Sequence, residues 1–194
     1  MSGSGLVTIR TYRQDDIGLV HALSDLLSAQ SLYHRFFVGT PRIPTGYLRS
    51  LKTVDHRDRE VLIALQEDTH AVAIAEYTRD TAAPRTADLA MLVADAWQRR
   101  GLARLLLDSL SEIALSCGIT HFKADVLADN KAVQTAIHRH RPGSLSVEGS
   151  DGLRHFLLRT DPAPHIDEKE TEHVEGRNGQ GPHPADRRRI HVLA

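Results

Sequence analysis

The sequence predicts an α+β fold of mixed α/β character, in which helices pack on a largely antiparallel sheet. Short runs of β-branched and apolar residues, bounded by polar turns, recur through the chain. Between two of these runs lies a stretch with apolar residues at helical spacing. The chain has 194 residues, of which 41% are hydrophobic and 25% charged, a composition typical of one globular domain with its own core.

The first third of the chain is predicted to be mostly helical after an initial strand. Asp15 and Asp16 are suitable N-cap residues for the first helix. The apolar residues that follow recur at helical spacing and form one face: Ile17, Val20, Leu23, Leu26 and Leu27. The predicted elements are a strand at residues 7–11, this helix, a second helix at 31–37 and a short third helix that starts at Pro44.

The rest of the folded part alternates strands with helices. The strongest predicted helix carries Leu102, Leu106, Leu110 and Ile113 on one face, and Gly118 ends it. Around it the sequence predicts strands at residues 61–65, 71–77, 87–93 and 122–127, a helix at 130–138, and a closing hairpin of 145–147 with 153–158.

Both ends of the chain differ in composition from the middle. Residues 1–5 are predicted to be a flexible leader, residues 6–160 the folded domain and residues 161–194 a disordered tail. The tail is rich in proline, glycine and charge and has no apolar period until its last few residues. Its histidines match no metal-ligand spacing, so no metal is expected. Its run of Arg187, Arg188 and Arg189 is interpreted as solvated charge, with an anionic partner as the alternative.

Charge and apolar content argue against several classes of protein. The formal net charge of -1 gives no bulk attraction to nucleic acid or to anionic lipid. No apolar run approaches the roughly 18 residues of a membrane span, and the N-terminus lacks the pattern of a secretory signal. Cys117 is the only cysteine, and its apolar neighbours indicate a buried structural thiol rather than a catalytic one. We therefore expect a cytoplasmic protein.

One loop has the features of an anion site. It joins the predicted strand at residues 87–93 to the strongest helix, and its Gly101 permits close backbone approach. The first-turn N–H groups of the helix and the helix dipole together favour a pyrophosphate there. Arg99, Arg100 and Arg104 add positive charge. A tight turn with solvated arginines is the alternative, and local physics alone does not separate the two.

A resemblance to a known family favours the anion site. Gln98, Gly101 and Ala103 resemble the Gln/Arg-x-x-Gly-x-Gly/Ala motif of the GNAT superfamily of N-acetyltransferases, with Val93 at the end of the preceding strand. The surrounding order of strand, loop, helix, strand and helix, with Asn130 after the later strand, extends the resemblance over residues 7–158. It implies a GNAT-like twisted sheet and acetyl-CoA as co-substrate.

A narrower resemblance concerns bacterial protein lysine acetyltransferases of the Pat type. Residues 31–37, Ser-Leu-Tyr-His-Arg-Phe-Phe, look like a segment found early in those enzymes, and residues 87–98 look like their cofactor strand. Those enzymes often carry a regulatory or synthetase domain as well, and this chain is too short for either. Tyr33, Phe36 and Phe37 are expected to form a core stripe on their helix, which is compatible with shaping an acceptor groove.

The resemblance implies roles for specific residues in acyl transfer from a CoA thioester to an amine. The family stabilises the thioester oxygen with a backbone N–H where the cofactor strand splays or bulges, which falls at Met91, Leu92 and Val93 here. The implied cofactor loop comprises Gln98, Arg99, Arg100, Gly101, Leu102, Ala103 and Arg104. Asn130 has two open roles: a hydrogen bond to the cofactor arm or an N-cap for the following helix.

Two positions depart from the family pattern. Many relatives place a tyrosine seven residues after the asparagine, to protonate the leaving thiolate, and this chain has Ile137 there. The family's glycine four residues further on is Arg141, with Gly143 nearby. A thiol with a reference pKa of about 8.5 leaves without a strong acid at neutral pH, so turnover does not require the tyrosine. His138 and Tyr33 are the candidate substitutes.

Two carboxylates compete as general base. Asp88 lies five residues before Val93, where Pat-type enzymes resemble this chain but carry glutamate. Asp125 lies five residues before Asn130, where other family members carry glutamate. Burial in an apolar strand is expected to raise the pKa of either residue. We favour Asp88, because the match around it is longer, and a plain surface or salt-bridged carboxylate is the alternative for each.

The sequence therefore predicts an acetyl-CoA-dependent N-acetyltransferase that acts on a primary amine. The acceptor is either a protein lysine or a small molecule, and the chain is expected to work without nucleic acid or membrane, with a homodimer as one expectation. A catalytically weak acyl-CoA-binding regulatory protein is the alternative from a different class, because Ile137 replaces the tyrosine.

Overall fold

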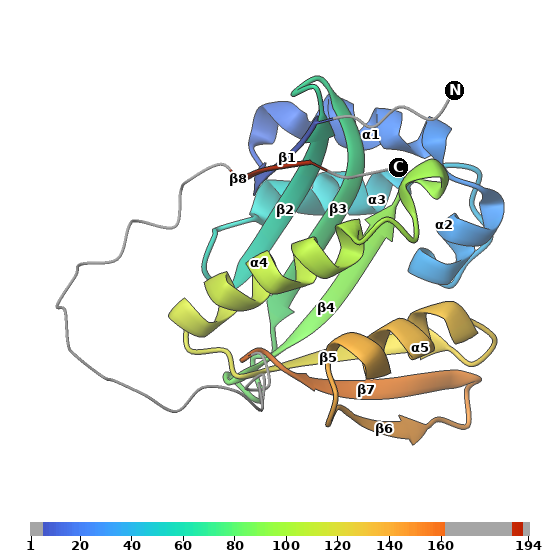
Figure 1. Cartoon of the computed structure of the whole chain (residues 1–194), viewed down its shortest axis with the longest axis vertical. Coiled ribbons are helices and arrows are strands. Elements are labelled where there is room, and N and C mark those ends of the chain that lie inside the picture. The colour runs from blue at the N-terminus through green and yellow to red at the C-terminus, as the bar shows by residue number, and fades with distance from the viewer. Residues whose placement is uncertain (1–5, 162–187, 192–194) are drawn as a thin grey trace, which may run out of the picture.

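A computed structural model describes residues 6–161 and 188–191. Its centre is an eight-stranded sheet with the strand order β6-β7-β5-β4-β3-β2-β1-β8 (Figure 1). All neighbouring strands are antiparallel except β4 and β5, which are parallel. The strands are β1 (Leu6–Thr11), β2 (Arg59–Gln66), β3 (His70–Arg79), β4 (Thr86–Val93), β5 (His121–Leu127), β6 (Leu145–Glu148), β7 (Leu153–Arg159) and β8 (Arg188–His191).

Helices flank this sheet on both faces. Figure 1 shows α4 crossing the front of the sheet, with α3 behind it. The helices are α1 (Ile17–Ala22), α2 (Ala29–Phe36), α3 (Thr45–Ser50), α4 (Leu102–Ser116) and α5 (Lys131–His140), with single 3₁₀ turns η1 (Gln14–Asp16), η2 (Leu23–Leu26), η3 (Leu51–Thr53) and η4 (Asp95–Trp97). The predicted fold class, a largely antiparallel sheet flanked by helices, is confirmed.

The helix α4 holds the centre of the core. Leu102, Leu106 and Leu110 recur every four residues, and each is at most 1% exposed against the sheet. Burying such a side chain stabilises the fold by about 1.5–3 kcal/mol. Gly118 follows the helix with a φ of 79°, a left-handed conformation that ends it at little steric cost. Cys117 is partly buried against the same core, as a structural thiol would be.

The first predicted helix is shorter than its apolar pattern indicates. Helix α1 ends at Ala22, and the chain continues as the 3₁₀ turn η2. A 3₁₀ turn has three residues per turn instead of 3.6, so side chains rotate off the buried face, and Leu26 is 46% exposed. Asp16 does not cap α1 with its side chain, because Arg10 and the N–H of Arg13 bind its carboxylate.

The C-terminal strand β8 lies within the predicted disordered tail. Its residues pair antiparallel with β1, with Val7 opposite Ile190. The outer edge of β1 offers unpaired backbone groups to an extended segment, and residues 188–191 occupy it. The predicted leader at residues 1–5 and tail residues 162–187 and 192–194 lie outside the described residues. In the part that the structure describes, no helix has the length and apolar character needed to span a bilayer.

Candidate functional site

The strands β4 and β5 separate after a short stretch of parallel pairing. Three residue pairs join them, and the last pair is Asp88 with Lys123. Beyond this point β4 stays paired with β3 as far as Val93, and β5 stays paired with β7 as far as Leu127. The two strands therefore splay toward their carboxyl ends (Figure 1). This β4–β5 splay leaves one edge of β4 without a strand partner among the described residues.

Backbone direction decides which groups face the splay. The N–H of Ala94 donates a hydrogen bond to the carbonyl of Val72 at a distance of 2.9 Å. The strand β4 pairs with β3 without a register shift. Because backbone groups alternate along an antiparallel strand, the N–H of Leu92 also faces β3. The N–H groups of Met91 and Val93 face the splay instead. Of the three residues that the sequence analysis assigns to this role, two thus present a free donor, and β4 splays rather than bulges.

The loop after β4 ends in an uncapped helix. Gly101 adopts a φ of 82°, and no side chain caps the first turn of α4. A Cβ added at Gly101 would meet no atom within 4 Å, so the space above this glycine is open. Leu102 is buried, whereas Ala103 and Arg104 are exposed. The first-turn N–H groups and the positive end of the helix dipole therefore face an open region that suits an anion.

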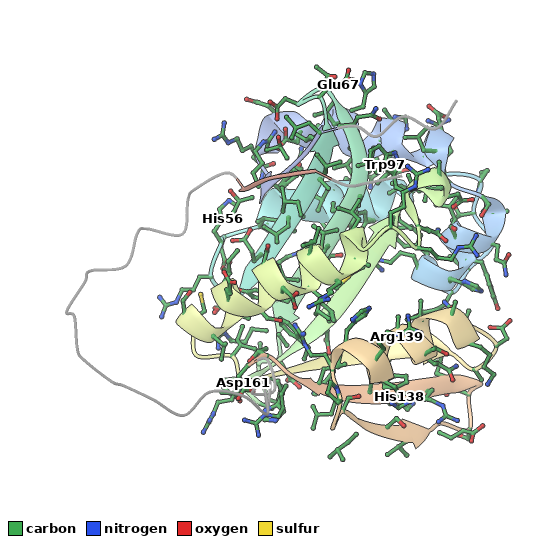
Figure 2. The ribbon with its side chains drawn as sticks, in the orientation of Figure 1. His56, Glu67, Trp97, His138, Arg139 and Asp161 are labelled. Carbon is green, nitrogen blue, oxygen red and sulfur yellow. The ribbon has the colours of Figure 1, made fainter. Side chains whose placement is uncertain are left out.

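The polar residues of the loop fasten it to its surroundings. The side-chain amide of Gln98 donates to the carbonyl of Val93 and to the hydroxyl of Ser31, each at 3.1 Å. Arg100 lies over the ring of buried Trp97, with 5.5 Å between its guanidinium carbon and the ring centroid; Trp97 is labelled in Figure 2. Arg99 is exposed, with a left-handed φ of 60°. Gln98 therefore positions the loop, while Arg99 stays available to solvent.

A cavity of about 400 Å³ lies where α2, the η4 loop and the start of α5 meet. Its lining comprises Ser28, Gln30, Ser31, His34, Asp95, Gln98, Asp129, Asn130, Lys131 and Ala132. Asp95 joins two of these elements, because it accepts hydrogen bonds from the Ser31 hydroxyl at 2.6 Å and from the Ser28 N–H at 3.0 Å. Burial raises the pKa of Asp95, but these hydrogen bonds outweigh it and hold the pKa below its ordinary value.

Asn130 takes one of its two expected roles, as the N-cap of α5. Its side-chain oxygen accepts a hydrogen bond from the Val133 N–H at 3.3 Å, so Asn130 caps the helix. The same residue lines the cavity. Ile137, at the position of the family's tyrosine, packs partly buried against the core. Arg141 is buried and binds Asp108 of α4 at 2.8 Å.

Asp88 lies at the apex of the splay, on the face of the sheet that carries α2. Thr78 is its partner on β3, two residues from Glu76, and Glu76 binds Arg35 of α2. Cross-strand partners, and residues two apart in a strand, share a face of the sheet. Among residues 6–161, the Asp88 carboxylate has no hydrogen-bond or ion-pair partner. Although the residue is exposed, partial burial of its carboxyl raises the pKa of Asp88.

Asp125 lies on the same face of the sheet as Asp88, but its carboxylate already binds another side chain. Its carboxylate binds Nδ1 of His155 on β7 at 2.7 Å, with both side chains about half exposed. Lys123 lies between the two aspartates and forms an ion pair with Asp80. Asp88, Asp125 and Asp80 interact electrostatically with Lys123. The apex is therefore a polar site in which Asp88, unlike Asp80 and Asp125, has no ion-pair partner among residues 6–161.

The two candidate substitutes for the tyrosine lie elsewhere. Tyr33 is 43% exposed on α2 and does not line the cavity. His138 packs edge-on against Phe156 of β7, with ring centroids 5.7 Å apart. The cavity instead presents His34 and Lys131, to which sequence reasoning gives no role. His34 adjoins Tyr33 in the segment that resembles Pat-type enzymes, but only the packing of α2 shows which of the two side chains faces the cavity.

The family comparison agrees with this geometry. The model of the acetyltransferase (GNAT) family matches residues 22–140. That range contains the β4–β5 splay and the uncapped start of α4. This chain belongs to the GNAT family.

Individual relatives of this GNAT protein include Pat acetyltransferases. It is 32% identical over 114 residues to "Acetyltransferase Pat" of Mycolicibacterium smegmatis, which covers 58% of this chain and 34% of that protein. The chain thus spans about a third of the length of this curated relative. The crystal structure of the GNAT domain of S. lividans PAT is 29% identical, with a TM-score of 0.69, covering 78% of this chain and 89% of that one.

A more distant structure supports the fold alone. The protein yncA from Salmonella typhimurium, solved with its cofactor acetyl-CoA, is 20% identical to this GNAT protein. Its TM-score is 0.61, and the match covers 83% of this chain and 98% of that one.

Proposed function

We propose that residues 6–160 form an N-acetyltransferase domain that transfers an acetyl group from acetyl-CoA to a primary amine, with a protein lysine as the favoured acceptor. One observation carries the proposal: the free edge of β4 at Met91 and Val93 leads directly into the uncapped first turn of α4. A strand edge followed directly by a helix N-terminus offers hydrogen-bond donors in a row. They match the pantetheine arm of coenzyme A, whose amides lead to a pyrophosphate.

The described residues fit acetyl-CoA in this position. The free backbone groups of β4 suit the amides of the pantetheine arm, and the open space above Gly101 suits the pyrophosphate. Arg99 adds a positive charge beside that space. When bound, acetyl-CoA supplies a thioester, whose carbonyl carbon reacts with an amine.

The chain's own residues then have separate tasks. Asp88 accepts the proton that the acceptor amine must lose before or as its nitrogen attacks the thioester carbon. The N–H of Met91 or Val93 donates to the oxygen, on which negative charge develops. The carbon–sulfur bond breaks, and the thiolate takes a proton from solvent, which a thiol with a reference pKa of about 8.5 permits. Residue 88 is an aspartate where Pat-type enzymes have glutamate. Because its side chain is one methylene shorter, we infer that Asp88 acts through a bridging water.

The acceptor reaches the apex from the face of α2. Asp88 is exposed there, so a side chain from another protein has access to it. The segments at residues 31–37 and 87–98, which resemble protein lysine acetyltransferases of the Pat type, favour a lysine side chain. A small amine is the second candidate acceptor. Ile137, which packs on the core where relatives place a tyrosine, favours the alternative of a catalytically weak regulatory protein.

The test is an acceptor screen that follows free thiol release with acetyl-CoA. Lysine-containing peptides, whole proteins and small amines are supplied in parallel, and mass spectrometry locates the transferred acetyl group. Thiol release that depends on an amine supports the enzyme. Binding of acetyl-CoA without release in any arm would favour the regulatory protein. The predicted cytoplasmic location and homodimer stay predictions.

A further inference from the structure

A group of basic residues lies between α4 and α5, outside the β4–β5 splay. Arg104 is in the first turn of α4, whereas Arg139 and His140 are in the last turn of α5. Buried Arg141 brings the two helices together, because its guanidinium binds Asp108 of α4 at 2.8 Å and Ser111 at 3.3 Å. Figure 2 shows Arg139 on α5.

These basic residues are close enough for the two arginines to influence His140. Burial lowers the pKa of His140, and the positive charges of Arg104 and Arg139 lower it further. Arg104 approaches Asp108 only at 3.6 Å, and Asp108 already binds Arg141. In the described part of the chain, Arg139 makes no hydrogen bond or ion pair. The group therefore carries positive charge that its surroundings only partly balance.

Helix electrostatics explain only half of this arrangement. Cations at the end of α5 are favoured by the negative end of its dipole, which accounts for Arg139 and His140. Arg104 lies in the first turn of α4, where the dipole disfavours a cation. Placing Arg104 near Arg139 adds repulsion between two positive charges, which a bound anion would offset.

The position of the group indicates which anion that is. Arg104 is three residues after Gly101, within one helical turn of the proposed pyrophosphate site. With the acyl end of coenzyme A in the splay, the adenosine end continues beyond the pyrophosphate and out of the sheet. The only other charged group on that end is the phosphate monoester on the ribose 3′ oxygen.

We propose that Arg104, Arg139 and His140 form a subsite for the 3′-phosphate of coenzyme A, and thereby select coenzyme A over its dephosphorylated form. The subsite rests on the proposed function, because it requires the pyrophosphate at the start of α4. Guanidinium groups suit a phosphate through charge-assisted hydrogen bonds. His140 adds a neutral N–H donor once its pKa lies below neutral pH, and a further charge below that pKa.

The experiment is titration calorimetry of the full chain with coenzyme A and with 3′-dephospho-coenzyme A. The wild type is expected to bind coenzyme A about tenfold more tightly, the effect of one or two partly exposed charge-assisted hydrogen bonds. In Arg139→Gln, and more completely in Arg104→Gln/Arg139→Gln, the ratio should fall toward one. Affinity for the dephosphorylated ligand should change little in Arg139→Gln.

Arg42→Gln is the matched control, because Arg42 is an exposed arginine outside α4 and α5 that pairs with Asp25 of η2; it should keep the wild-type ratio. A wild-type ratio near one, with both ligands bound, overturns the subsite and leaves the proposed function standing. An unchanged ratio in the double variant also overturns it. If the wild type binds neither ligand, the proposed function fails and the subsite with it.

Discussion

Asp88 of β4 lies directly opposite Lys123 of β5, at the last position where the two strands pair. One aspartate thus marks the apex of the splay and lies beside a lysine that binds a different carboxylate, Asp80. The positive charge of Lys123 lowers the pKa of Asp88, against the larger effect of burial, which raises it. The candidate base is therefore partly desolvated at the point where β4 and β5 stop pairing.

Asp88→Asn is expected to lower kcat by roughly 10²–10⁴-fold, the usual cost of losing a general base. Acetyl-CoA binding should change little, because Asp88 is at the apex and not on the loop before α4. Steady-state kinetics and calorimetry measure the two effects. Asp125→Asn is the matched control, and it should do less, since Asp125 already binds His155. If the Asp125 variant is inactive and the Asp88 variant is not, the two roles must be exchanged.

The pH dependence of kcat/KM tests the environment of Asp88. The base must be ionised, so activity should fall as the pH falls through the pKa of Asp88, which burial raises above 3.8. Lys123→Gln removes a charge that lowers this pKa, so the acid limb should move to higher pH. Lys52→Gln, an exposed lysine in η3, should leave the profile in place. A shift to lower pH in Lys123→Gln would contradict this account.

Gly101→Glu should abolish acetyl-CoA binding, because it places a side chain and a negative charge in the open space before α4. Any side chain at a φ of 82° also strains the backbone, by roughly 1–2 kcal/mol. Gly101→Gln carries the same strain and a side chain of the same size without the charge, and should keep more of the affinity in calorimetry. Wild-type affinity in Gly101→Glu would show that the pyrophosphate is held elsewhere.

The buried carboxylate of Glu76 is expected to be important for stability. It binds Arg35 of α2 at 2.5 Å and Arg59 of β2 at 2.8 Å, and its side chain is 9% exposed. Glu76→Ala leaves two guanidinium groups uncompensated and should lower the free energy of unfolding by about 3–5 kcal/mol. Denaturant titration measures this. Asp25→Ala, which breaks the exposed Arg42 pair, should cost at most about 1 kcal/mol.

A chain that ends at Asp161 lacks β8 and exposes the edge of β1. Its Tm is expected to fall by about 2–4 °C, the shift that ~1 kcal/mol causes in a domain of this size. Acetyl-CoA affinity should be unchanged, because β2 and β3 separate β1 from β4. Thermal scans and calorimetry measure both quantities. A loss of affinity would show that the C-terminal residues reach the cofactor site.

Much of the fold is determined by local patterns. Leu102, Leu106 and Leu110 predict α4 because every fourth residue returns to the same face of a helix. The sequence also predicts the open start of this helix, because Gly101 directly before it lets the backbone approach a ligand closely. The alternation of strands and helices was sufficient to predict a largely antiparallel sheet with flanking helices.

Tertiary structure decided which of these residues share a site. The strands β4 and β5 stop pairing after Asp88 and Lys123, because β5 continues along β7 instead. No local sequence pattern predicts where that separation begins. The pairing of β4 with β3 also turns the backbone N–H groups of Met91 and Val93, but not that of Leu92, toward the splay. The packing of α5 against α4 brings Arg104 near Arg139. Local spacing determines elements because neighbouring residues share a backbone geometry. Register and helix contacts join residues far apart in the chain, so only the packed fold determines them.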